Sequence, residues 1–169
     1  MAHKVMFKLV LENILNISSE ILVISANPSL LAGSGISGLI HKAAGAQLEA
    51  AAKRCSPLKP GQATITPAFN LSAKYVIHAV CPRYMDGQRG ESELLYNAYA
   101  SALALHSQTP DAKSITFVSM GTGVYKWPIA LAADIAVKAL LMSTFEETLM
   151  CVIDEETRLI YQASLDSHL

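Results

Sequence analysis

Two glycine-rich turns carry the residues best suited to bind a ligand in this chain. The first spans residues 33–38 (GSGISG) and the second spans residues 121–125 (GTGVY), and each lies between a strand-like and a helix-like segment. Glycine lets backbone N–H groups turn toward one point without a Cβ in the way, and the helix start that follows adds partial positive charge. Together the two turns predict a cradle for phosphate groups.

Neither turn contains Lys or Arg. If both turns face one cleft, backbone amides would hold the anion, which suits a diphosphate within a larger ligand better than a nucleic-acid backbone. The formal net charge of -1 and the absence of a basic run also argue against a nucleic-acid partner. Binding by counterion release needs clustered Lys and Arg.

Length and composition set further limits. At 169 residues, 51% of them hydrophobic, the chain predicts one domain over residues 1–169, and we expect a monomer. The most hydrophobic stretch, 129–142, contains Asp134 and Lys138, and the N-terminus lacks the apolar core of a signal peptide, so we expect no membrane partner. The three cysteines are an odd number and lack metal-ligand spacing, so we expect a reduced cytoplasmic protein with no bound metal. We also expect no cofactor.

Apolar runs rich in branched residues alternate with helical patterns along the chain. The expected strands are residues 5–11, 21–26, 63–66, 75–80, 114–119 and 149–153. The expected helices are residues 39–55, 91–106, 129–141 and 155–165, with Pro128 placed to begin the third. One face of the first helix carries Ile40, Ala44, Leu48, Ala51 and Cys55. The alternation predicts an α/β sheet covered on both faces, with ligands bound beyond the carboxyl ends of strands, which both glycine turns follow.

The first turn also matches the G-x-G-x-x-G pattern of dinucleotide-binding Rossmann domains. That site needs the first glycine at the strand end and an acidic residue about twenty positions later. Here residues 27–32 separate the strand from Gly33, and the next expected strand, 63–66, ends without an acid. The spacing therefore disfavours a Rossmann site.

Five segments, in order, resemble the macrodomain family. They are residues 25–31 (SANPSLL), 33–45 (GSGISGLIHKAAG), 75–82 (YVIHAVCP), 120–128 (MGTGVYKWP) and 152–156 (VIDEE). The likeness is greatest to the bacterial MacroD-type branch. It implies a three-layer α/β/α sandwich around a mixed sheet, with a cleft for ADP-ribose. Members of the family bind ADP-ribose or act on ADP-ribosyl esters, including O-acetyl-ADP-ribose and mono-ADP-ribosylated acidic side chains.

The resemblance also implies roles for particular residues. Asn27 matches the asparagine that contacts the distal ribose, Tyr125 the aromatic position of the second phosphate loop, and Ile153 a position that packs against adenine. The ligand contacts that it implies are Asn13, Ile14, Asn27, Gly33, Ser34, Gly35, Ile36, Gly38, Gly121, Thr122, Gly123, Val124, Tyr125 and Ile153. An amide can both donate to and accept from a sugar hydroxyl, which agrees with the role of Asn27.

Three positions depart from the family pattern. Asn13 stands where an acidic residue usually accepts from the adenine amino group, and a neutral acceptor forms a weaker bond. Ser37 stands where the MacroD-type branch has an aspartate assigned to water activation, and a serine is a poor base without a partner. The sequence favours Ser37 as the N-cap of a helix over 38–55 rather than as a catalytic residue. Cys81, in place of a usual glycine, we expect to be a small buried residue.

Other residues with reactive side chains fit structural roles. We expect His78 to be a hydrogen-bonded core histidine, because its neighbours in the expected strand are apolar, and Trp127 to be a core aromatic. His41 and His106 lack partners at metal-ligand spacing. Tyr125, by its motif position, is expected in the cleft.

Three functions remain open from the sequence. The first is an ADP-ribosyl hydrolase in which the substrate's own phosphate activates water while Asn27 fixes the ribose. The second is a non-catalytic reader of ADP-ribose, and the third is a partner-binding domain with a decayed cleft. The glycines of both turns are retained where a backbone must approach a ligand, which argues against decay.

Overall fold

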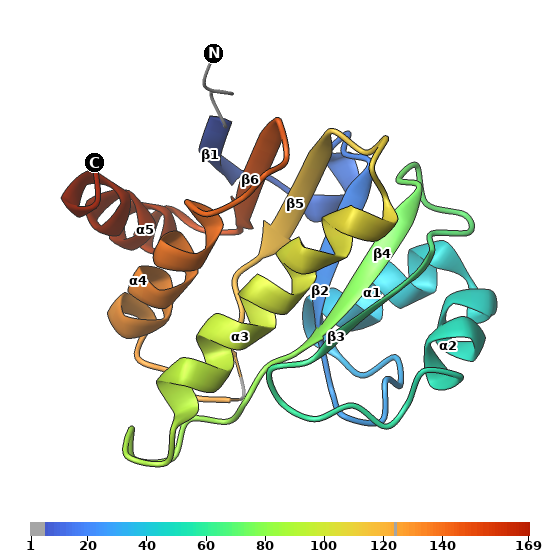
Figure 1. Ribbon diagram of the computed structural model, residues 1–169, viewed down its shortest axis with the longest axis horizontal. Helices are drawn as coiled ribbons and strands as arrows, with labels where there is room; N and C mark the ends of the chain where they lie inside the picture. The colour runs from blue at the N-terminus through green and yellow to red at the C-terminus, as the bar shows by residue number, and fades with distance from the viewer. Residues whose placement is uncertain (1–5, 124) are drawn as a thin grey trace.

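The computed structural model of this chain describes residues 6–123 and 125–169, and it forms a six-stranded sheet flanked by helices (Figure 1). The strands are β1 (Met6–Leu11), β2 (Ile21–Ala26), β3 (Ala63–Pro67), β4 (Tyr75–Val80), β5 (Ser114–Val118) and β6 (Glu147–Val152). The helices are α1 (Gly35–Ala44), α2 (Ala46–Lys53), α3 (Glu91–Ala104), α4 (Ile129–Leu140) and α5 (Glu155–Ser167). Two 3-10 turns, η1 (Ile14–Asn16) and η2 (Leu105–Gln108), complete the elements.

The strands lie in the order β1-β6-β5-β2-β4-β3. β3 pairs antiparallel with β4, and the other neighbouring strands pair parallel. The mixed sheet that the family resemblance implied is therefore confirmed. In this order β2 and β5 are neighbours, so the loops that follow them, which hold the two glycine turns, leave the sheet side by side.

Successive residues of β2 pack on opposite faces of the sheet, as strand geometry requires. Val23 belongs to a core cluster with residues of α3, α4 and α5, whereas Leu22 and Ile24 pack with residues of α1 and α2. In Figure 1, α3 crosses in front of the sheet and α1 lies behind it. The three-layer α/β/α arrangement is confirmed.

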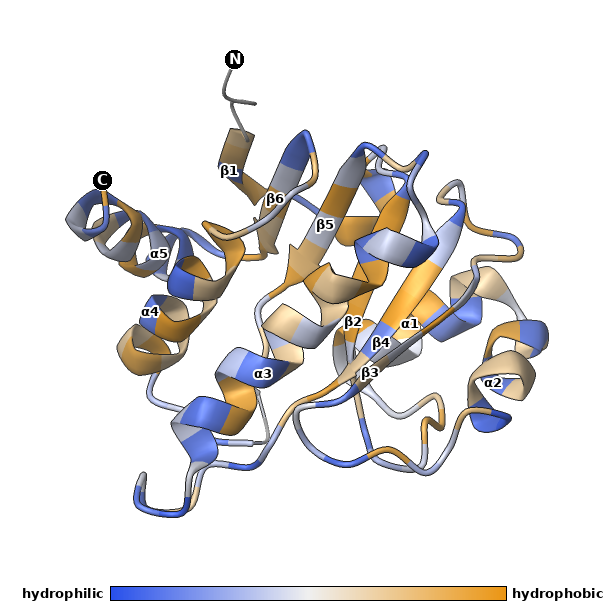
Figure 2. Ribbon diagram, in the orientation of Figure 1, coloured by the Kyte–Doolittle hydropathy of each residue, from blue (hydrophilic) through white to orange (hydrophobic). Residues whose placement is uncertain are grey.

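Hydrophobic residues are concentrated on the central strands β2, β4 and β5, which appear orange in Figure 2. These strands are covered on both faces and read as nearly continuous apolar runs, as buried parallel strands do. Among residues 6–123 and 125–169, no helix is long and apolar enough to cross a membrane.

The expected single helix over residues 39–55 is wrong. Two helices replace it, because Gly45 has a φ of +95° and ends α1 while serving as the N-cap of α2. A side chain is strained at such a φ, and a Cβ on Gly45 would lie 3.1 Å from Nδ2 of Asn70. The break changes the helical phase, so that Ala52, rather than the expected Ala51, is buried beyond it.

The remaining elements differ from expectation only at their ends. α3 ends at Ala104 and continues as η2, α5 extends to Ser167, and β6 begins at Glu147. Pro128 is the N-cap of α4, which agrees with its expected place at the helix start. Residue 5, the first of the first expected strand, lies outside the described residues. Shifts of one or two residues are usual at element ends.

His78 is a buried core histidine, as the sequence predicted. Its side chain is fully buried in β4, and Nε2 lies 3.0 Å from Oγ1 of Thr66 on β3. Burial, and to a smaller extent the neighbouring His41, lowers the pKa of His78 to about 3. The neutral imidazole is therefore the native form.

We expect the free energy of unfolding to fall as the pH is lowered from 7 to 5. In this window the unfolded state, with a histidine pKa of about 6.5, takes up a proton that native His78 does not bind. The contribution of neutral His78 to the free energy of unfolding is thus fully present above a pH of about 6.5. As the pH falls from there toward 3, this free energy decreases by up to about 1.4 kcal/mol per pH unit. Urea unfolding at several pH values measures this slope, and His78→Gln should reduce it; equal slopes in both proteins would contradict the assignment.

Candidate ligand-binding cleft

A cleft of about 560 Å³ lies at the carboxyl ends of β2, β5 and β6. The two glycine turns and the residues that follow β6 line it. Of the predicted contacts, the cleft brings together Asn27, Gly33, Ser34, Gly35, Ile36, Gly121, Thr122, Gly123, Tyr125 and Ile153, and Ser37 also lines it. Segments almost ninety residues apart thus face one cavity because β2 and β5 are adjacent.

A second hollow of about 480 Å³ adjoins this cleft. It contains Asn13 and Ile14, and it shares Ile36 and Ile153 with the cleft, so the two form one groove. Gly38 lines neither hollow, and Val124 lies outside the described residues. The groove has room for an elongated ligand.

The N-terminus of α1 opens into the cleft. α1 begins at Gly35, and its N-cap, Ser34, makes no capping hydrogen bond through its side chain. The first amides of a helix have no acceptor within the helix, and they carry the positive end of its dipole. Because Gly35, Ile36 and Ser37 line the cleft, this end of the groove suits an anion.

The expected role of Ser37 as an N-cap is wrong. The helix begins at Gly35, three residues earlier than that role required, so Ser37 lies in the first turn of α1. Its hydroxyl donates to the backbone carbonyl of Ala32 at 3.2 Å. Ser37 is therefore bonded to the first loop rather than to the end of its own helix.

Buried tyrosines support the second glycine turn from the other side. Ser119 is the residue after β5, and its Oγ lies 2.7 Å from the hydroxyl oxygen of Tyr161 on α5. The Met120 N–H donates to the hydroxyl of Tyr99 on α3 at 2.9 Å. Both tyrosines are fully buried, and burial raises the pKa of Tyr161 to about 12, so it remains a neutral phenol.

Trp127 closes the second turn, and its expected core position is confirmed. Its indole Nε1 donates to the carbonyl of Pro82 at 2.8 Å, and only 4% of the residue is exposed. A Cβ on Gly121 would clash with the Trp127 ring. Glycine is required at position 121 because the indole packs directly on its backbone. Cys81, beside Pro82, is also buried as expected, and burial raises the pKa of its thiol to about 12.

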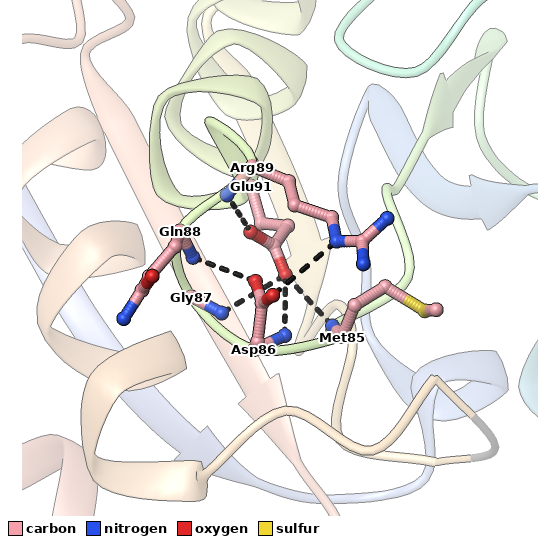
Figure 3. Close-up of polar contacts among 6 residues, drawn as sticks. All are labelled: Met85, Asp86, Gly87, Gln88, Arg89 and Glu91. Carbon is pink, nitrogen blue, oxygen red and sulfur yellow. Dashed lines mark hydrogen bonds and ion pairs between the residues drawn. The ribbon is translucent and has the colours of Figure 1, made fainter.

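The loop between β4 and α3 is held by one carboxylate (Figure 3). Glu91 accepts from the N–H groups of Met85 (2.7 Å), Asp86 (3.1 Å), Gly87 (3.1 Å) and Arg89 (2.7 Å). These bonds, with that of Met85 the strongest, lower the pKa of Glu91 to about 2. The loop is therefore fixed while Glu91 is ionised.

This loop in turn braces the second glycine turn. The Tyr84 N–H donates to the carbonyl of Tyr125 at 3.0 Å, and the guanidinium of Arg83 lies 5.3 Å from the centre of the Tyr125 ring. A cation over an aromatic face is attractive. Tyr125 is thus held at the cleft, in agreement with its expected placement.

Asn13 has a bond that the sequence did not predict. Its Oδ1 accepts from the Leu15 N–H at 3.0 Å, which makes Asn13 the N-cap of η1. A carbonyl oxygen has two lone pairs, so one acceptor position remains for a ligand. The carboxylate of Glu12 lines the same hollow, and it already accepts from the Asn13 N–H at 2.9 Å.

Few charged groups line the groove. None of the described residues that line either hollow is Lys or Arg, and the carboxylates are Glu12 and Asp154. Asp154 caps α5 by accepting from the Thr157 N–H at 2.7 Å, a bond that lowers its pKa. The Cys151 thiol donates to the Glu12 carbonyl at 3.1 Å, and burial raises its pKa to about 11. Bound phosphate would therefore rely on backbone amides and helix dipoles.

Several lining residues were missed by the sequence reasoning. Those with hydroxyl or carboxylate side chains in the main cleft are Ser25, Ser119, Asp154 and Thr157. Ser25 and Ser119 were detectable as polar residues at the carboxyl ends of apolar strands, where this class of fold binds ligands. Asp154 has the signature of an N-cap before an acidic first turn. In the described part of the chain, no three His, Cys, Asp or Glu side chains gather as a metal site requires.

Comparison with known proteins identifies the family to which this fold belongs. The family model described as Macro domain matches residues 23–136, which is more than half of the chain. The chain therefore belongs to the Macro domain family.

Similar proteins agree with this assignment. The chain is 38% identical over 170 residues to a Klebsiella pneumoniae protein named O-acetyl-ADP-ribose deacetylase, covering 95% of this chain and 97% of that protein. Among solved structures, the Oceanobacillus iheyensis macrodomain with ADP matches with a TM-score of 0.86 and 33% identity, over 95% of this chain and 90% of that one. A mutant of that macrodomain with ADPR matches with a TM-score of 0.87 and 32% identity, over 95% and 91%.

Proposed function

We propose that this chain binds ADP-ribose and hydrolyses ADP-ribosyl esters, namely O-acetyl-ADP-ribose or mono-ADP-ribosylated acidic side chains. One observation carries the proposal: both glycine turns, Asn27 and the uncapped N-terminus of α1 line a single cleft. The macrodomain solved with ADP and with ADPR, and the relative named O-acetyl-ADP-ribose deacetylase, support the choice of ligand.

The groove suggests how such a ligand would lie. Asn27 would contact the distal ribose, and the two glycine turns would hold the diphosphate through their amides. The adjoining hollow would take the adenine, with Ile153 against the ring and the free lone pair of Asn13 facing its amino group. Ile153 is 68% exposed without a ligand, so an adenine ring stacked there would cover apolar surface.

Hydrolysis consumes one water and cleaves the bond between the distal ribose and the acyl group. The products are ADP-ribose with a free hydroxyl and a carboxylic acid, which loses its proton at neutral pH. Acceleration requires a water held over the carbonyl carbon of the ester and donors that face the developing oxyanion.

Substrate phosphate is the base that fits this site best. The Ser37 hydroxyl already donates to Ala32, and Cys151 is a neutral thiol. Asp154 follows β6, which is two strands from β2 and hence roughly 10 Å from the end that carries Asn27. A phosphate oxygen held by the glycine turns would lie beside the ribose and could position or activate the water.

A non-catalytic reader is the alternative function, favoured by the absence of a carboxylate at position 37. In either case we propose a monomeric, single-domain cytoplasmic protein of bacterial type, without a nucleic-acid or membrane partner.

We expect ADP-ribose to saturate one site and to raise the melting temperature. A ligand at about 100 times its dissociation constant adds roughly 2.7 kcal/mol, or about 5–10 °C for a domain of this size. Isothermal calorimetry and a thermal scan measure both effects, with AMP as the weaker control ligand. If millimolar ADP-ribose produced no binding heat and no shift of the melting temperature, the binding proposal would be contradicted.

Product analysis then separates the hydrolase from the reader. The protein is incubated with O-acetyl-ADP-ribose and with a protein ADP-ribosylated on acidic side chains, and released ADP-ribose or acetate is quantified. Turnover above the solvent background supports the hydrolase. Tight binding without turnover supports the reader.

A further inference from the structure

The loop between β2 and α1 has its main chain held by side chains. The Asn27 side chain forms hydrogen bonds with both backbone polar groups of Leu31. Its Nδ2 donates to the Leu31 carbonyl at 3.0 Å, and its Oδ1 accepts from the Leu31 N–H at 3.2 Å. Asn27 therefore fixes the loop as well as facing the cleft.

Glu49 of α2 holds the next atom along this backbone. Its Oε2 accepts from the Ala32 N–H at 2.7 Å. That N–H belongs to the same peptide group as the Leu31 carbonyl, so Asn27 and Glu49 hold one peptide group from its two ends. A bond to an ionised carboxylate is shorter and stronger than one between neutral groups.

The following peptide group is also held. Ser37 donates to the Ala32 carbonyl at 3.2 Å. Because this peptide group is trans, the Gly33 N–H points away from the Ser37 hydroxyl. Within the described residues that N–H has no acceptor, and Gly33 lines the cleft. The contacts of Ala32 thus determine the direction of a free loop amide that lines the cleft.

The loop is held against backbone strain. Leu30 has a φ of +56°, which costs a residue with a side chain on the order of 1 kcal/mol. Its side chain is nevertheless buried, with 1% exposed. Such a conformation persists only when surrounding contacts impose it, and the bonds of Asn27 and Glu49 to the next residues are contacts of that kind.

We propose that Glu49 is a positioning residue for the ligand, which acts by fixing the Ala32 peptide group and through it the Gly33 amide. The inference rests on the proposed function, because it assigns that amide to the ribose and diphosphate of ADP-ribose. Glu49 does not line the cleft, so this role is an indirect one.

A simpler role for Glu49 must be distinguished. The residue lies in the first turn of α2, where any carboxylate interacts favourably with the helix dipole. That role depends on the charge alone. The positioning role depends instead on an acceptor atom that reaches Ala32.

Three substitutions separate the two roles. Glu49→Gln removes the charge but keeps a carbonyl oxygen at the same reach, whereas Glu49→Asp keeps the charge on a side chain shorter by one bond, about 1.5 Å. Glu49→Ala removes both. Glu146→Ala is the matched control, since it deletes an exposed carboxylate beside the start of β6, four strands away from β3, on which α2 packs.

Two readouts are combined. The first is the hydrogen exchange of the Ala32 amide in the ligand-free protein, measured by NMR, which needs neither binding nor turnover. The second is ester hydrolysis, with kcat and KM determined separately, together with the affinity for ADP-ribose.

We expect Glu49→Gln to keep slow exchange at Ala32 and to keep most of the activity. Glu49→Asp and Glu49→Ala should lose the protection and lower kcat roughly 10- to 100-fold, because displacement by about 1 Å costs alignment of this order. KM should change less than kcat, and Glu146→Ala should resemble the wild type.

Two results would overturn the positioning role. One is the reverse order, with Glu49→Asp active and Glu49→Gln impaired. The other is unchanged kcat and affinity in a Glu49→Ala protein whose Ala32 amide has become exposed. If the wild type binds but does not turn over, the same comparison is made on affinity. A wild type that neither binds nor hydrolyses would reject the proposed function and this role with it, while the exchange data still report whether the contact exists.

Discussion

Replacing Gly123 with glutamate is expected to abolish ADP-ribose binding while leaving the fold intact. A Cβ at position 123 meets no atom within 4 Å, and its backbone does not require the left-handed conformation, so the side chain can be accommodated. Its carboxylate would enter the cleft where the diphosphate is expected. Unpaired like charges cost several kcal/mol, so we expect at least a roughly 100-fold loss of affinity.

Calorimetry with ADP-ribose measures this loss, and circular dichroism verifies the fold. Gly123→Ser is the steric control, and Gln108→Glu adds the same charge at an exposed position at the end of η2. Both controls should bind nearly as the wild type does. Retained affinity in folded Gly123→Glu would show that the second turn does not hold phosphate. Position 123 is a cleaner test than position 35, where a φ of +64° would strain any side chain.

Asn27→Ala should lower ester hydrolysis by about 100-fold or more, while ADP-ribose affinity falls roughly tenfold or less. Both amide atoms of Asn27 bond Leu31, yet Oδ1 keeps a second lone pair and Nδ2 a second hydrogen for a ribose hydroxyl. The substitution removes the ribose contact and loosens the loop. Alignment matters most in the transition state, so kcat should suffer more than binding.

Single-turnover release of ADP-ribose from an ester substrate gives the rate, and calorimetry gives the affinity. Gln108→Ala, which removes an exposed amide side chain at the end of η2, is the matched control. Ser37→Ala should cost only a few-fold, since Asn27 and Glu49 still hold the loop. Equal losses of rate and affinity in Asn27→Ala would mean that Asn27 contributes uniform binding, as in a reader.

Much of the fold followed from local pattern. Apolar runs located the strands to within two residues, because a buried strand must be apolar wherever it lies in the sheet. The expectation that glycine turns after parallel strands would share a cleft also held, since β2 and β5 pair side by side. The adjacency of β2 and β5 came only from the structure, because periodicity alone does not order strands.

The helical segment after the first turn shows where local pattern failed. Residues 39–55 have the periodicity of one helix, and Gly45 alone gave little warning of a break. The interruption follows from tertiary contact: the Asn70 N–H donates to the Ala44 carbonyl at 3.3 Å, and the Asn70 side chain occupies the space beside Gly45. Such a contact involves a distant turn, so no pattern within the helix encodes it.

The sequence by itself predicted the glycine turns that could bind a diphosphate, because such turns are local features, and its resemblance to macrodomains implied the ribose role of Asn27. Only the tertiary structure decided how those residues are held. Ser37 bonds Ala32 instead of capping its helix, and Glu49, 17 residues from Ala32, reaches the same peptide region from α2. The Glu49 bond depends on how α2 follows α1 after the break at Gly45. A hydrogen bond between distant residues leaves no periodic signal in a single sequence.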